Sequence, residues 1–490
     1  MYGDEKIATV VNGEVEVTKK VEKKSVVVIG AGPAGLTAAV GLLKRGYDVS
    51  VIEAESEVGG MSKSFELWGH TVDLGPHRYF SSDTRVNKIW LESVTGAYHM
   101  VSRLTRIYYQ GKYYNYPLDL KNVLGNLGIV RSLEVCISYI FRSTSVGKAD
   151  NFENWTISRF GRQLYLMFFK TYSERLWGMS CTELDADFAR QRIRKLSLFE
   201  VVKAAILGNS GQHKTLADVF AYPKAGSGAV YQNMAKSITE LGGRIYLSQR
   251  VDKFESSDGR INSVLTTEGR LACDYLISTM PITSLVRGLN PDSNVRNSVA
   301  QLEFRNTVLV YLLVNQKNVF SDQWVYIHDP EVKSGRITNF SNWGINDDLE
   351  TSVLCLEYWC NDNESLWSLD NESLASIAKS DIHVAFGLSS GLVIASTVRK
   401  VYKSYPVYRC GYANHMEIIK DYLDTYENVF PIGRYGAFKY NNQDHSILMG
   451  ILVCEKISGN SEIDLWSVNS DDEYQESSRI TQDGLVVDEG

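Results

Sequence analysis

A glycine-rich motif between an apolar strand and a helix most constrains how this 490-residue chain can fold. The run SVVVIG ends at Gly30 and is short, apolar and rich in β-branched residues, as expected of a parallel strand buried on both faces. The next residues, AGPAGLTAAVGLLKRG, have helical periodicity, and YDVSVIEA predicts a second strand that ends near Glu53. A strand, a helix and a strand in this order form one βαβ unit, so we expect a parallel sheet covered by helices.

The spacing of the glycines indicates that this unit binds a dinucleotide. Gly30, Gly32 and Gly35 have the spacing GxGxxG. The first glycine of that motif permits a tight turn, the second lets the backbone approach a pyrophosphate, and the third lets the helix pack on the strand. Pro33 and Ala34 begin the helix, so its N-terminus would face the phosphates.

The end of the second strand indicates which ribose is bound. Glu53, followed by Ala54, stands where a carboxylate binds free 2′- and 3′-hydroxyls and disfavours a 2′-phosphate. The alternative is a glycine-rich turn beside an unrelated surface Glu. It explains the strand, the glycine spacing and the carboxylate less well than a dinucleotide site does.

Composition and charge argue against several other classes of protein. A formal net charge of -7 provides no basic face for a nucleic acid. The seven Cys are an odd number without CxxC spacing, which favours reduced thiols over a disulfide framework. The N-terminal residues lack the apolar core of a signal peptide, and no uninterrupted apolar run is long enough to span a bilayer. The sequence therefore predicts a soluble, cytoplasmic protein without a metal site.

One apolar stretch, residues 122–141, comes nearest to a membrane span. Arg131 and Glu134 interrupt it, so we interpret it as a buried helix.

The segment after the second strand favours FAD over NAD. It carries a further glycine pair that ends at Gly60, followed by Met61 and Ser62, and it resembles the extended signature of FAD-binding flavoproteins of the amine-oxidase and mutase type. A pattern of short alternating strands ends in CDYLISTMP and resembles the returning segment of the same group, which implies that Val251 and Thr279 flank the adenosine. A second GxGxxG for NAD(P)H is absent, so one FAD is predicted.

Changes of pattern along the chain predict an α/β fold. It combines a Rossmann-like FAD-binding domain of the GR2 type with an inserted helical domain and an antiparallel β-sheet substrate domain. The expected parts are a flexible leader (1–23), a discontinuous FAD-binding domain (24–85, 215–288 and 410–458), a mainly helical insertion (86–214), a β-sheet substrate domain (289–409) and a solvated acidic tail (459–490).

Several further motifs, all in one order, resemble those of UDP-galactopyranose mutases. GPHRYFSSDTRVNKIW, which begins at Gly75, is similar to a loop of that family. GRQLYLMFFKTYSERLWGMSCTELDAD resembles one of its helices and contains Tyr172 and Trp177. GRYGAFKYNNQDHS, which begins at Gly433, resembles the family's last motif most closely. The resemblance extends over residues 26–452 and places the chain in the superfamily of FAD-dependent amine oxidases and mutases.

The resemblance implies a sugar-nucleotide mutase, an isomerase of polysaccharide biosynthesis. It would interconvert the pyranose and furanose forms of a nucleoside-diphosphate hexose without net redox change. In that family N5 of reduced FAD attacks the anomeric carbon and displaces the diphosphate, and the sugar opens and recloses before the diphosphate returns. The implied partner is a sugar nucleotide. The reductant stays open, with NADPH as one candidate, and so does the oligomeric state, with a homodimer as one alternative.

The resemblance also implies which residues hold the cofactor. Gly433 and Arg434 would meet the flavin pyrophosphate, and the helix after them would point its N-terminus at the flavin ring. His77 would lie beside the flavin. The full predicted cofactor set is Gly30, Gly32, Pro33, Ala34, Gly35, Glu53, Ala54, Gly60, Met61, Ser62, Gly75, Pro76, His77, Val251, Thr279, Gly433, Arg434, Asn442, Gln443 and Ser446.

The same resemblance implies a catalytic set. Tyr172 and Trp177 would line the sugar pocket, and Tyr440 would hydrogen-bond the diphosphate. Each residue also has a structural alternative: a turn histidine, core aromatics or ordinary surface residues. We interpret Asp444 and His445 as caps of the final helix. The full predicted catalytic set is His77, Tyr172, Trp177, Arg192, Tyr440 and Asn442.

Two arginines that bind the diphosphate in the family have no exact counterpart in this sequence. An alignment without gaps places Gln191 at the first position, between Arg190 and Arg192, and a one-residue shift assigns the role to Arg192. At the second position the strand TVLVYLLV is followed by no Arg; Arg305 precedes it and Lys317 follows it. One lost Arg–phosphate contact costs on the order of 2 kcal/mol. This departure keeps a second hypothesis open, a FAD-dependent oxidoreductase of the amine oxidase or desaturase type that acts on a small molecule.

Overall fold

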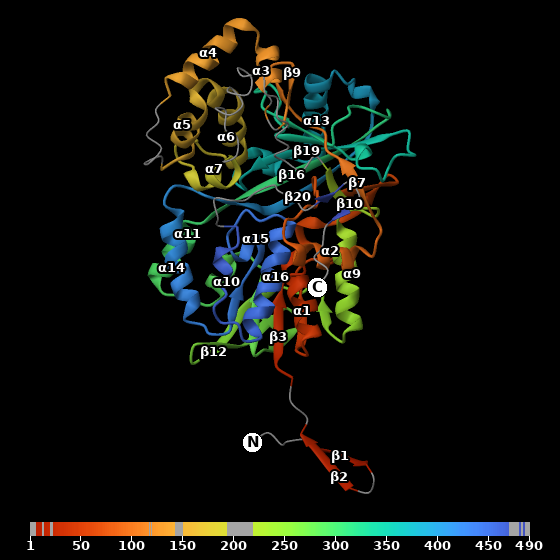
Figure 1. The fold of residues 1–490 in the computed structure, drawn as a ribbon, viewed down its shortest axis with the longest axis vertical. Coiled ribbons are helices and arrows are strands. Elements are labelled where there is room, and N and C mark those ends of the chain that lie inside the picture. The colour runs from red at the N-terminus through yellow and green to blue at the C-terminus, as the bar shows by residue number, and fades with distance from the viewer. Residues whose placement is uncertain are drawn as a thin grey trace.

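The computed structural model of the protein describes residues 6–11, 14–19, 23–116, 118, 120–142, 150–193, 219–469, 480–481 and 484–485. A parallel sheet lies at one end of the body, a larger mixed sheet at the other end, and a group of helices beside the larger sheet (Figure 1).

The first sheet has five parallel strands in the order β11-β4-β3-β15-β21. It contains the predicted βαβ unit, which consists of β3 (Ser25–Ile29), α1 (Pro33–Lys44) and β4 (Asp48–Ile52). Four of the five residues of both strands are buried, because helices cover the sheet. The remaining strands are β11 (Arg244–Tyr246), β15 (Tyr275–Ser278) and β21 (Val429–Pro431).

Small residues let α16 (Gln443–Ile457) pack closely along α1. A Cβ atom at Gly450 would lie 2.8 Å from the carbonyl oxygen of Ala34, so a larger residue would push the helices apart. The close packing fixes the start of α16 beside the glycine turn. α9 (Gly228–Glu240) packs on α1 as well, and α2 (Thr84–Val94) packs on α9.

The predicted short alternating strands form a separate antiparallel sheet. Its strands are β12 (Val251–Ser257), β13 (Arg260–Thr266) and β14 (Gly269–Ala272), after which the chain enters β15 of the parallel sheet. Smaller pairs join β5 (Ser64–Leu67) to β6 (His70–Asp73), and β7 (Tyr98–Ser102) to β10 (Val219–Pro223). Three further helices lie together on one side of the part that contains the parallel sheet (Figure 1). They are α10 (Ile282–Gly288), α11 (Ser293–Ala300) and α14 (Tyr412–Asp424).

The larger sheet has seven strands and is antiparallel except where β17 pairs with β8. Every residue of β19 is buried, because both faces of the sheet are covered. Two of the strands come from residues 86–214, which the sequence predicted to be mainly helical. In sheet order the strands are β20 (Val393–Val407), β16 (Glu303–Val314), β19 (Ser352–Cys360), β18 (Arg336–Asn339), β17 (Trp324–Ile327), β8 (Thr105–Tyr109) and β9 (Lys112–Asn115).

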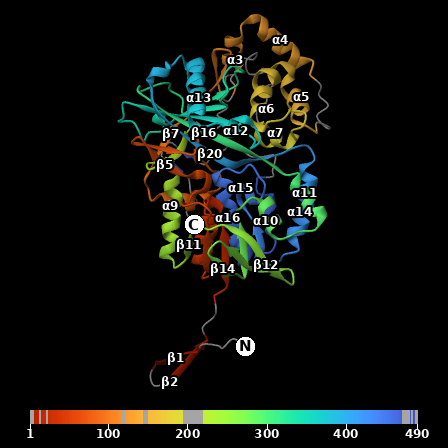
Figure 2. The same ribbon diagram turned by 180° about the vertical axis from the view of Figure 1, so that it is seen from behind.

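Helices lie at opposite flanks of the larger sheet (Figures 1 and 2). One flank is covered by α13 (Asn371–Phe386), whose Leu374, Ala378 and Ile382 join the core of that sheet. The other flank carries α5 (Phe152–Tyr165), the π-helix η3 (Leu166–Lys170), α6 (Thr171–Trp177) and α7 (Ala186–Ile193). α5 is kinked at Gly161, where φ is +79°.

The apolar stretch 122–141 is not one buried helix. It forms most of α3 (Leu120–Leu127) and all of α4 (Ile129–Ile140), which are separated at Gly128, where φ is +76°. Val135 is buried, but Ile129 and Phe141 are each 82% exposed. The prediction of a buried helix is therefore wrong, because α4 packs on the outside of α5 through one narrow face.

The residues after α16 are not all a solvated tail. Leu465 and Val468 are buried and join the core around the parallel sheet. Lys439 Nζ donates hydrogen bonds to the carbonyl oxygens of Trp466 and Val468, and Asn469 Nδ2 donates to the carbonyl oxygen of Tyr440 at 3.2 Å. The prediction of a solvated tail is wrong here, because two apolar side chains are enough to anchor an otherwise acidic segment.

The predicted leader contains regular structure. β1 (Lys6–Val11) and β2 (Glu14–Lys19) pair as an antiparallel two-stranded sheet. The sequence Asn12-Gly13 between two alternating segments is a strong hairpin signal. The prediction of a flexible leader did not include a hairpin. Within the described ranges, every helix is too short or too polar to cross a membrane.

Candidate active site

One cavity joins the carboxyl end of the parallel sheet to the larger sheet, and its volume is about 1520 Å³. One side, called the glycine wall, consists of residues around the turn after β3, the segment after β4, the turn after β21 and the start of α16. The other side, called the aromatic wall, consists of residues of α6 and the strands β16 to β20. Representative residues are Gly30, Gly32, Glu53, Ser62, Gly433 and Ser446 for the glycine wall, and Tyr172, Tyr326, His328, Arg336, Glu357 and Tyr405 for the aromatic wall.

The glycines of the motif have distinct roles in the glycine wall. Gly30 has a φ of +97°, and a Cβ atom at Gly35 would lie 2.0 Å from the Gly30 carbonyl oxygen, so the turn itself requires both. A Cβ atom at Gly32 would meet only the Cα of Gly60, at 3.8 Å. The backbone at Gly32 is therefore open toward the cavity, which fits the close approach of a pyrophosphate.

The Glu53 carboxylate holds the same turn together. Its Oε2 accepts a hydrogen bond from the backbone N–H of Ala31 at 2.7 Å, and its Oε1 accepts one from the N–H of Glu55 at 2.9 Å. Each carboxylate oxygen can accept two hydrogen bonds. The arrangement leaves acceptor capacity at the cavity for the hydroxyls of a ribose.

The start of α16 faces the cavity next to the glycine turn. Asn442 is the N-cap, and its N–H donates to His445 Nδ1 at 3.2 Å, so the predicted capping role of His445 is confirmed. Gln443 Oε1 accepts a hydrogen bond from the Tyr231 hydroxyl at 2.6 Å. Its buried Nε2 has no partner among the residues that the structure describes, and the side chain lines the cavity. A hydrogen-bond donor that is unpaired within the described residues, Gln443 Nε2, therefore lies beside the N-terminus of the 15-residue helix α16, where the helix dipole stabilises negative charge.

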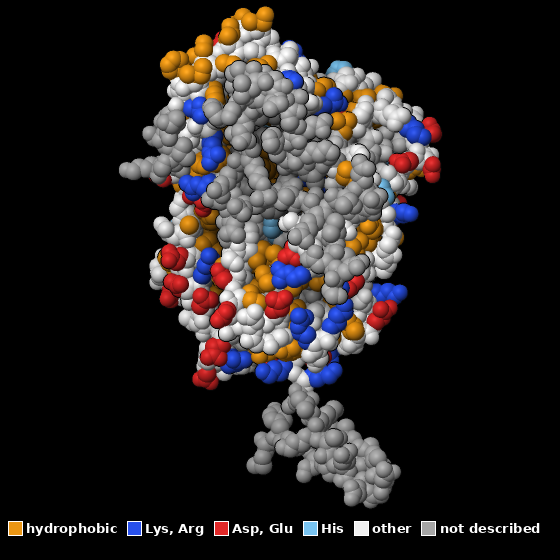
Figure 3. Space-filling model, viewed as in Figure 1, with side chains coloured by type: hydrophobic (Ala, Val, Ile, Leu, Met, Phe, Trp, Pro, Cys, Tyr) orange, Lys and Arg blue, Asp and Glu red, His pale blue; other side chains and the backbone are white. Residues whose placement is uncertain are grey.

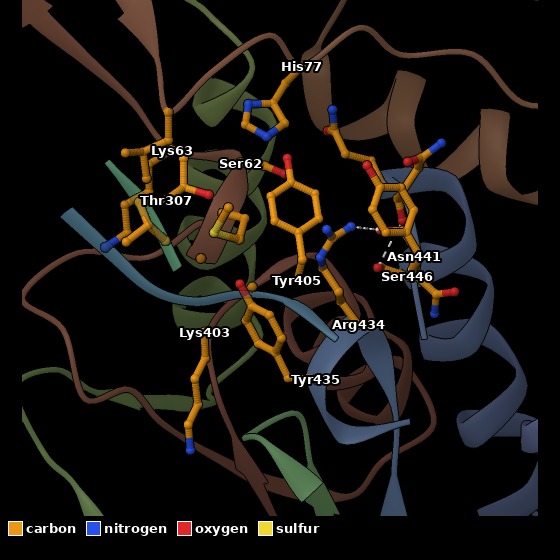
Figure 4. A pocket seen from close by; sticks show the side chains of 18 of the residues that line it. Ser62, Lys63, His77, Thr307, Lys403, Tyr405, Arg434, Tyr435, Asn441 and Ser446 are labelled. Carbon is orange, nitrogen blue, oxygen red and sulfur yellow. Dashed lines mark hydrogen bonds between the residues drawn. The ribbon is translucent and has the colours of Figure 1, made fainter. Parts of the chain in front are cut away.

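Arg434 ties the two walls together. Its Nε donates to the carbonyl oxygen of Ser404 at 3.0 Å and its Nη1 to that of Asn441 at 2.8 Å. The guanidinium carbon lies 4.8 Å from the ring centroid of Tyr405 and 4.4 Å from that of Tyr440. Figure 4 shows the Arg434 side chain beside Tyr405, with the bond to Asn441 dashed. The predicted contact of Arg434 with a pyrophosphate stays a prediction.

His77 reaches the cavity from the loop after β6 and points toward Tyr405 (Figure 4). Burial, and then the positive charges of Arg336 and Arg434, lower the pKa of His77 to about 3, so its ring is neutral at neutral pH. Its Nδ1 has no partner within the described part of the chain. The ring can therefore donate or accept one hydrogen bond at the cavity without adding charge.

The aromatic wall contains an ion pair that was not predicted from the sequence. Arg336 donates through Nε to Glu357 Oε1 at 2.5 Å and through Nη2 to Glu357 Oε2 at 2.6 Å. Burial alone would lower the pKa of Arg336, but the Glu357 carboxylate outweighs it and holds the pKa above its ordinary value. A signal was present, because Glu357 is the one charged residue in the apolar strand SVLCLEYW and needs a cation when it is buried.

Aromatic rings cover much of the same wall. Tyr172 stacks on His328 with ring centroids 4.7 Å apart, and Tyr405 stacks on Tyr440 at 5.4 Å. Trp177 is 1% exposed and does not line the cavity. Its ring lies edge-on to that of Tyr440 at 6.2 Å, so Trp177 occupies the core position that was its structural alternative.

The cations considered for the second diphosphate contact lie elsewhere. Arg305 is buried and donates to the carbonyl oxygens of Leu176 and Trp359, whereas Lys317 pairs with Glu350 on the surface. Neither lines the cavity. Neither residue therefore replaces the missing arginine, as the sequence indicated. The order of the strands brings a different cation, Arg336, to the cavity.

The first diphosphate contact remains a prediction. Arg190 is paired with Asp187 at 2.7 Å and does not line the cavity. Arg192 lies in the last turn of α7, but its side chain and that of Gln191 are outside the described residues.

The cavity gathers nearly the whole predicted cofactor set. Two members do not line it, Gly35 in the turn and Gly75, whose Cβ atom would lie 3.5 Å from Glu357 Oε1. No cluster of three metal-ligating side chains occurs in the ranges that the structure describes. The lining members are Gly30, Gly32, Pro33, Ala34, Glu53, Ala54, Gly60, Met61, Ser62, Pro76, His77, Val251, Thr279, Gly433, Arg434, Asn442, Gln443 and Ser446.

Residues 33–435 match the family of flavin containing amine oxidoreductases. A probable UDP-galactopyranose mutase of Klebsiella pneumoniae is 24% identical over 174 residues, which are 34% of this chain and 44% of that protein. A 1-hydroxycarotenoid 3,4-desaturase of Flavobacterium sp. is 22% identical over 314 residues, which are 59% of this chain and 63% of that protein. The chain thus spans 44% and 63% of the length of these two relatives.

Solved structures extend the likeness to almost the whole chain. The crystal structure of a reduced UDP-galactopyranose mutase covers 92% of this chain and 97% of its own, with a TM-score of 0.81 and 20% identity. A putative protoporphyrinogen oxidase from Exiguobacterium sp. covers 89% of this chain and 98% of its own, with a TM-score of 0.69 and 17% identity. The predicted fold class and the resemblance to the mutase-like flavoproteins are confirmed.

Proposed function

The chain belongs to the family of flavin containing amine oxidoreductases, and we propose that it is a FAD-dependent sugar-nucleotide mutase. The proposed reaction interconverts the pyranose and furanose forms of a nucleoside-diphosphate hexose. When it is bound and reduced, the flavin supplies a nucleophile and no net electrons pass to the substrate. One observation carries the proposal: a single cavity brings the glycine wall together with an aromatic wall that holds a buried cation, Arg336.

The glycine wall would hold FAD. Backbone N–H groups at the start of α1, beside Gly32, would bind the pyrophosphate, and Glu53 would bind the adenosine ribose. The N-terminus of α16, with Gln443 Nε2 and Ser446 beside it, would stabilise negative charge on the flavin ring. All of these groups are fixed before a ligand enters, because the turn, the carboxylate and the helix cap already have protein partners.

The aromatic wall would hold the diphosphate through Arg336. Its hydrogen bonds to Glu357 use Nε and Nη2, which leaves Nη1 for an oxygen of the diphosphate. The Glu357 carboxylate also fixes the plane of the guanidinium group. We assign the second contact to Arg192, which lies one helical turn after the cavity-lining Phe188. Two cations would keep the displaced diphosphate close enough to return.

Rings and neutral polar groups would position the hexose. Tyr172, stacked on His328, offers a flat face to a sugar or a base, and the Tyr440 hydroxyl offers a hydrogen bond to the diphosphate. His77 would lie beside the flavin as a neutral ring. The reaction class needs no Ser-His-Asp triad and no pair of carboxylates, so the lack of such a motif in the sequence agrees with it.

A second candidate function is that of a FAD-dependent oxidoreductase of the desaturase type. The matched desaturase covers more of this chain than the matched mutase does. Apolar side chains, namely Leu118, Phe168 and Phe169, also line the cavity and would suit an apolar substrate. Such an enzyme would start from oxidised FAD, would transfer electrons to an acceptor, and would not need Arg336.

An anaerobic turnover assay separates the two functions. The holoprotein is incubated with UDP- and dTDP-hexopyranoses and hexofuranoses, with its FAD either oxidised or reduced by dithionite, and the products are separated by anion-exchange chromatography. We expect the ring forms to interconvert in the reduced sample only. Reduction by NADPH in place of dithionite tests that reductant. No conversion, together with acceptor-dependent oxidation of a small molecule by the oxidised sample, would establish the second candidate instead.

A further inference from the structure

Helix α4 turns its apolar side away from the protein. Its inward face is narrow: Val135 is buried, and Ser138 Oγ accepts a hydrogen bond from the N–H of Gln163 on α5 at 3.1 Å. Its outward face carries large hydrophobic side chains that are between 54% and 82% exposed, namely Ile129, Val130, Leu133, Ile137 and Ile140, followed directly by Phe141.

These six side chains form one continuous stripe. At about 100° per residue, their positions fall within an arc of about 120° on the helix surface. Val135 lies on the opposite side, toward α5. Figure 3 shows hydrophobic side chains gathered at the end of the molecule where α4 lies in Figure 1. A stripe of this kind on a soluble protein indicates a surface that another partner covers.

The charges around the stripe indicate the chemistry of that partner. Residues 112–142 contain four basic side chains and only two acidic ones, whereas the whole chain has a net charge of -7. The basic residues are Lys112, Lys121, Arg131 and Arg142, and the acidic ones are Asp119 and Glu134. α4 itself carries only Arg131 and Glu134 and is neutral, so the excess of basic side chains comes from the segments that flank it. A strongly apolar helix flanked by basic side chains on an acidic protein matches a bilayer surface that carries anionic headgroups.

The shape of the region also favours a bilayer over a second folded protein. α4 forms a convex ridge at the end of the molecule (Figure 1), and a fluid bilayer can receive a convex ridge without a complementary groove. With 12 residues the helix is too short to span a bilayer, but it can lie in the interface with its apolar stripe among the acyl chains. We propose that the protein docks on anionic membrane surfaces through the apolar stripe of α4. The inference goes beyond the proposed function and holds for either reaction.

Vesicle flotation tests the proposal with the full-length holoprotein. Vesicles of phosphatidylcholine alone are compared with vesicles that also contain phosphatidylglycerol. We expect the protein to float with the anionic vesicles, and the double variant Leu133→Glu/Ile137→Glu to float at least tenfold less. The matched control is Ile394→Glu, which changes an equally exposed apolar residue on β20 and should float like the wild type. Unchanged flavin content in all variants verifies their fold.

A fluorescent probe reports where the helix lies. Cys136 is exposed next to the stripe, and Cys410 is the other exposed cysteine in the described part of the chain. An environment-sensitive dye attached to Cys136 in a Cys410→Ser background should shift its emission to the blue when anionic vesicles are added. Flotation of the double variant equal to that of the wild type would overturn the proposal. So would a wild type that self-associates through α4 in sedimentation velocity and does not bind vesicles.

Discussion

The glycine wall and the aromatic wall face the same cavity, but they are built by different means. In the glycine wall, the contacts that shape the turn join Gly30, Gly35, Ala31 and Glu53, which lie close together in the sequence. In the aromatic wall, the paired groups come from separate elements: Tyr172 meets His328 across more than a hundred residues, and the Arg336–Glu357 pair joins two strands.

The difference separates two properties of the protein. Cofactor binding should depend on local backbone shape, because the glycine wall presents N–H groups and an open Cα. Substrate choice should depend on side chains that the larger sheet assembles. Substitutions in the glycine wall should therefore remove the flavin, whereas substitutions in the aromatic wall should leave the flavin bound and change turnover.

The largest effect is expected at Gly32. A Gly32→Leu side chain would extend from the open backbone position into the space assigned to the pyrophosphate. We expect the fold to persist and the affinity for FAD to fall by about 100-fold or more, equivalent to about 3 kcal/mol. Flavin absorbance per protein measures the content, and circular dichroism measures the fold. Gly125→Ala on α3, where a Cβ atom meets nothing within 4 Å, is the matched control. Full flavin content in Gly32→Leu would show that the cofactor binds elsewhere.

A large effect on turnover, with flavin retained, is expected at Arg336. Arg336→Met removes the buried cation of the aromatic wall, and we expect kcat/KM for a sugar nucleotide to fall by about 100- to 1000-fold. The single variant also leaves Glu357 buried and unpaired, which costs about 3–5 kcal/mol of stability. The double variant Arg336→Met/Glu357→Gln should restore stability without restoring turnover.

The surface residue Lys317 provides the control for this comparison. Lys317→Met removes a cation that is paired with Glu350 outside the cavity, so turnover should stay at the wild-type level. Equal losses in Arg336→Met and Lys317→Met would mean that general electrostatics, not the aromatic wall, acts on the substrate.

A smaller effect, on KM, is expected where Asn469 of the C-terminal segment contacts the loop of Tyr440 and Asn441. Asn469 Nδ2 donates to the Tyr440 carbonyl oxygen and to Asn441 Oδ1 at 2.9 Å, so Asn469 is a positioning residue. Its loss should raise KM by up to about tenfold, because a hydrogen bond is worth about 1 kcal/mol, while kcat and flavin content stay unchanged. Asn469 has a φ of +55°, so comparing Asn469→Ala with Asn469→Gly separates backbone strain from the lost hydrogen bonds. If KM stays constant in both variants, the segment does not position Tyr440.

His328→Phe is expected to change the free energy of unfolding least at neutral pH and clearly in acid. Burial, and then the positive charge of Arg175, lower its pKa to about 3. Between about pH 3 and pH 6.5 the unfolded state therefore binds a proton that the folded state does not, and stability falls as the pH falls. His328→Phe should flatten this dependence by about 1.4 kcal/mol per pH unit.

Urea unfolding of the apoprotein at several pH values measures that slope. Tyr172→Phe is the matched control, because it disturbs the same stacked pair and removes no group that titrates in this range. Identical slopes in the wild type and in His328→Phe would mean that His328 is protonated in the folded protein.

Local motifs predicted much of the glycine wall. The strand, the glycine turn, α1 and the position of Glu53 all follow from residues within one βαβ unit. The family resemblance correctly predicts that the motif beginning at Gly433 lies at the cavity. The end of this motif forms the N-terminal cap of α16. The pattern of α4 was visible as well, but an amphipathic period does not indicate which face meets the protein, and so the helix was predicted to be buried.

The aromatic wall could not be predicted in the same way. Along the chain, the cation that follows β16 is Lys317, whereas the sheet order β16-β19-β18 places Arg336 beside Glu357. In the same way, nothing in the acidic C-terminal sequence indicates that Leu465 and Val468 join the core around the parallel sheet. These contacts join residues whose separation along the chain has no relation to their distance in space.

The sequence by itself determined the dinucleotide turn and its place at the end of a buried strand. The positive φ at Gly30 and the approach of Gly35 to the Gly30 carbonyl oxygen are local demands that glycine satisfies. The tertiary structure alone decided which side chains face the cavity. Strand order and register are properties of a whole sheet: they bring Arg336 to Glu357 and Tyr172 to His328, and they leave the apolar stripe of α4 facing outward.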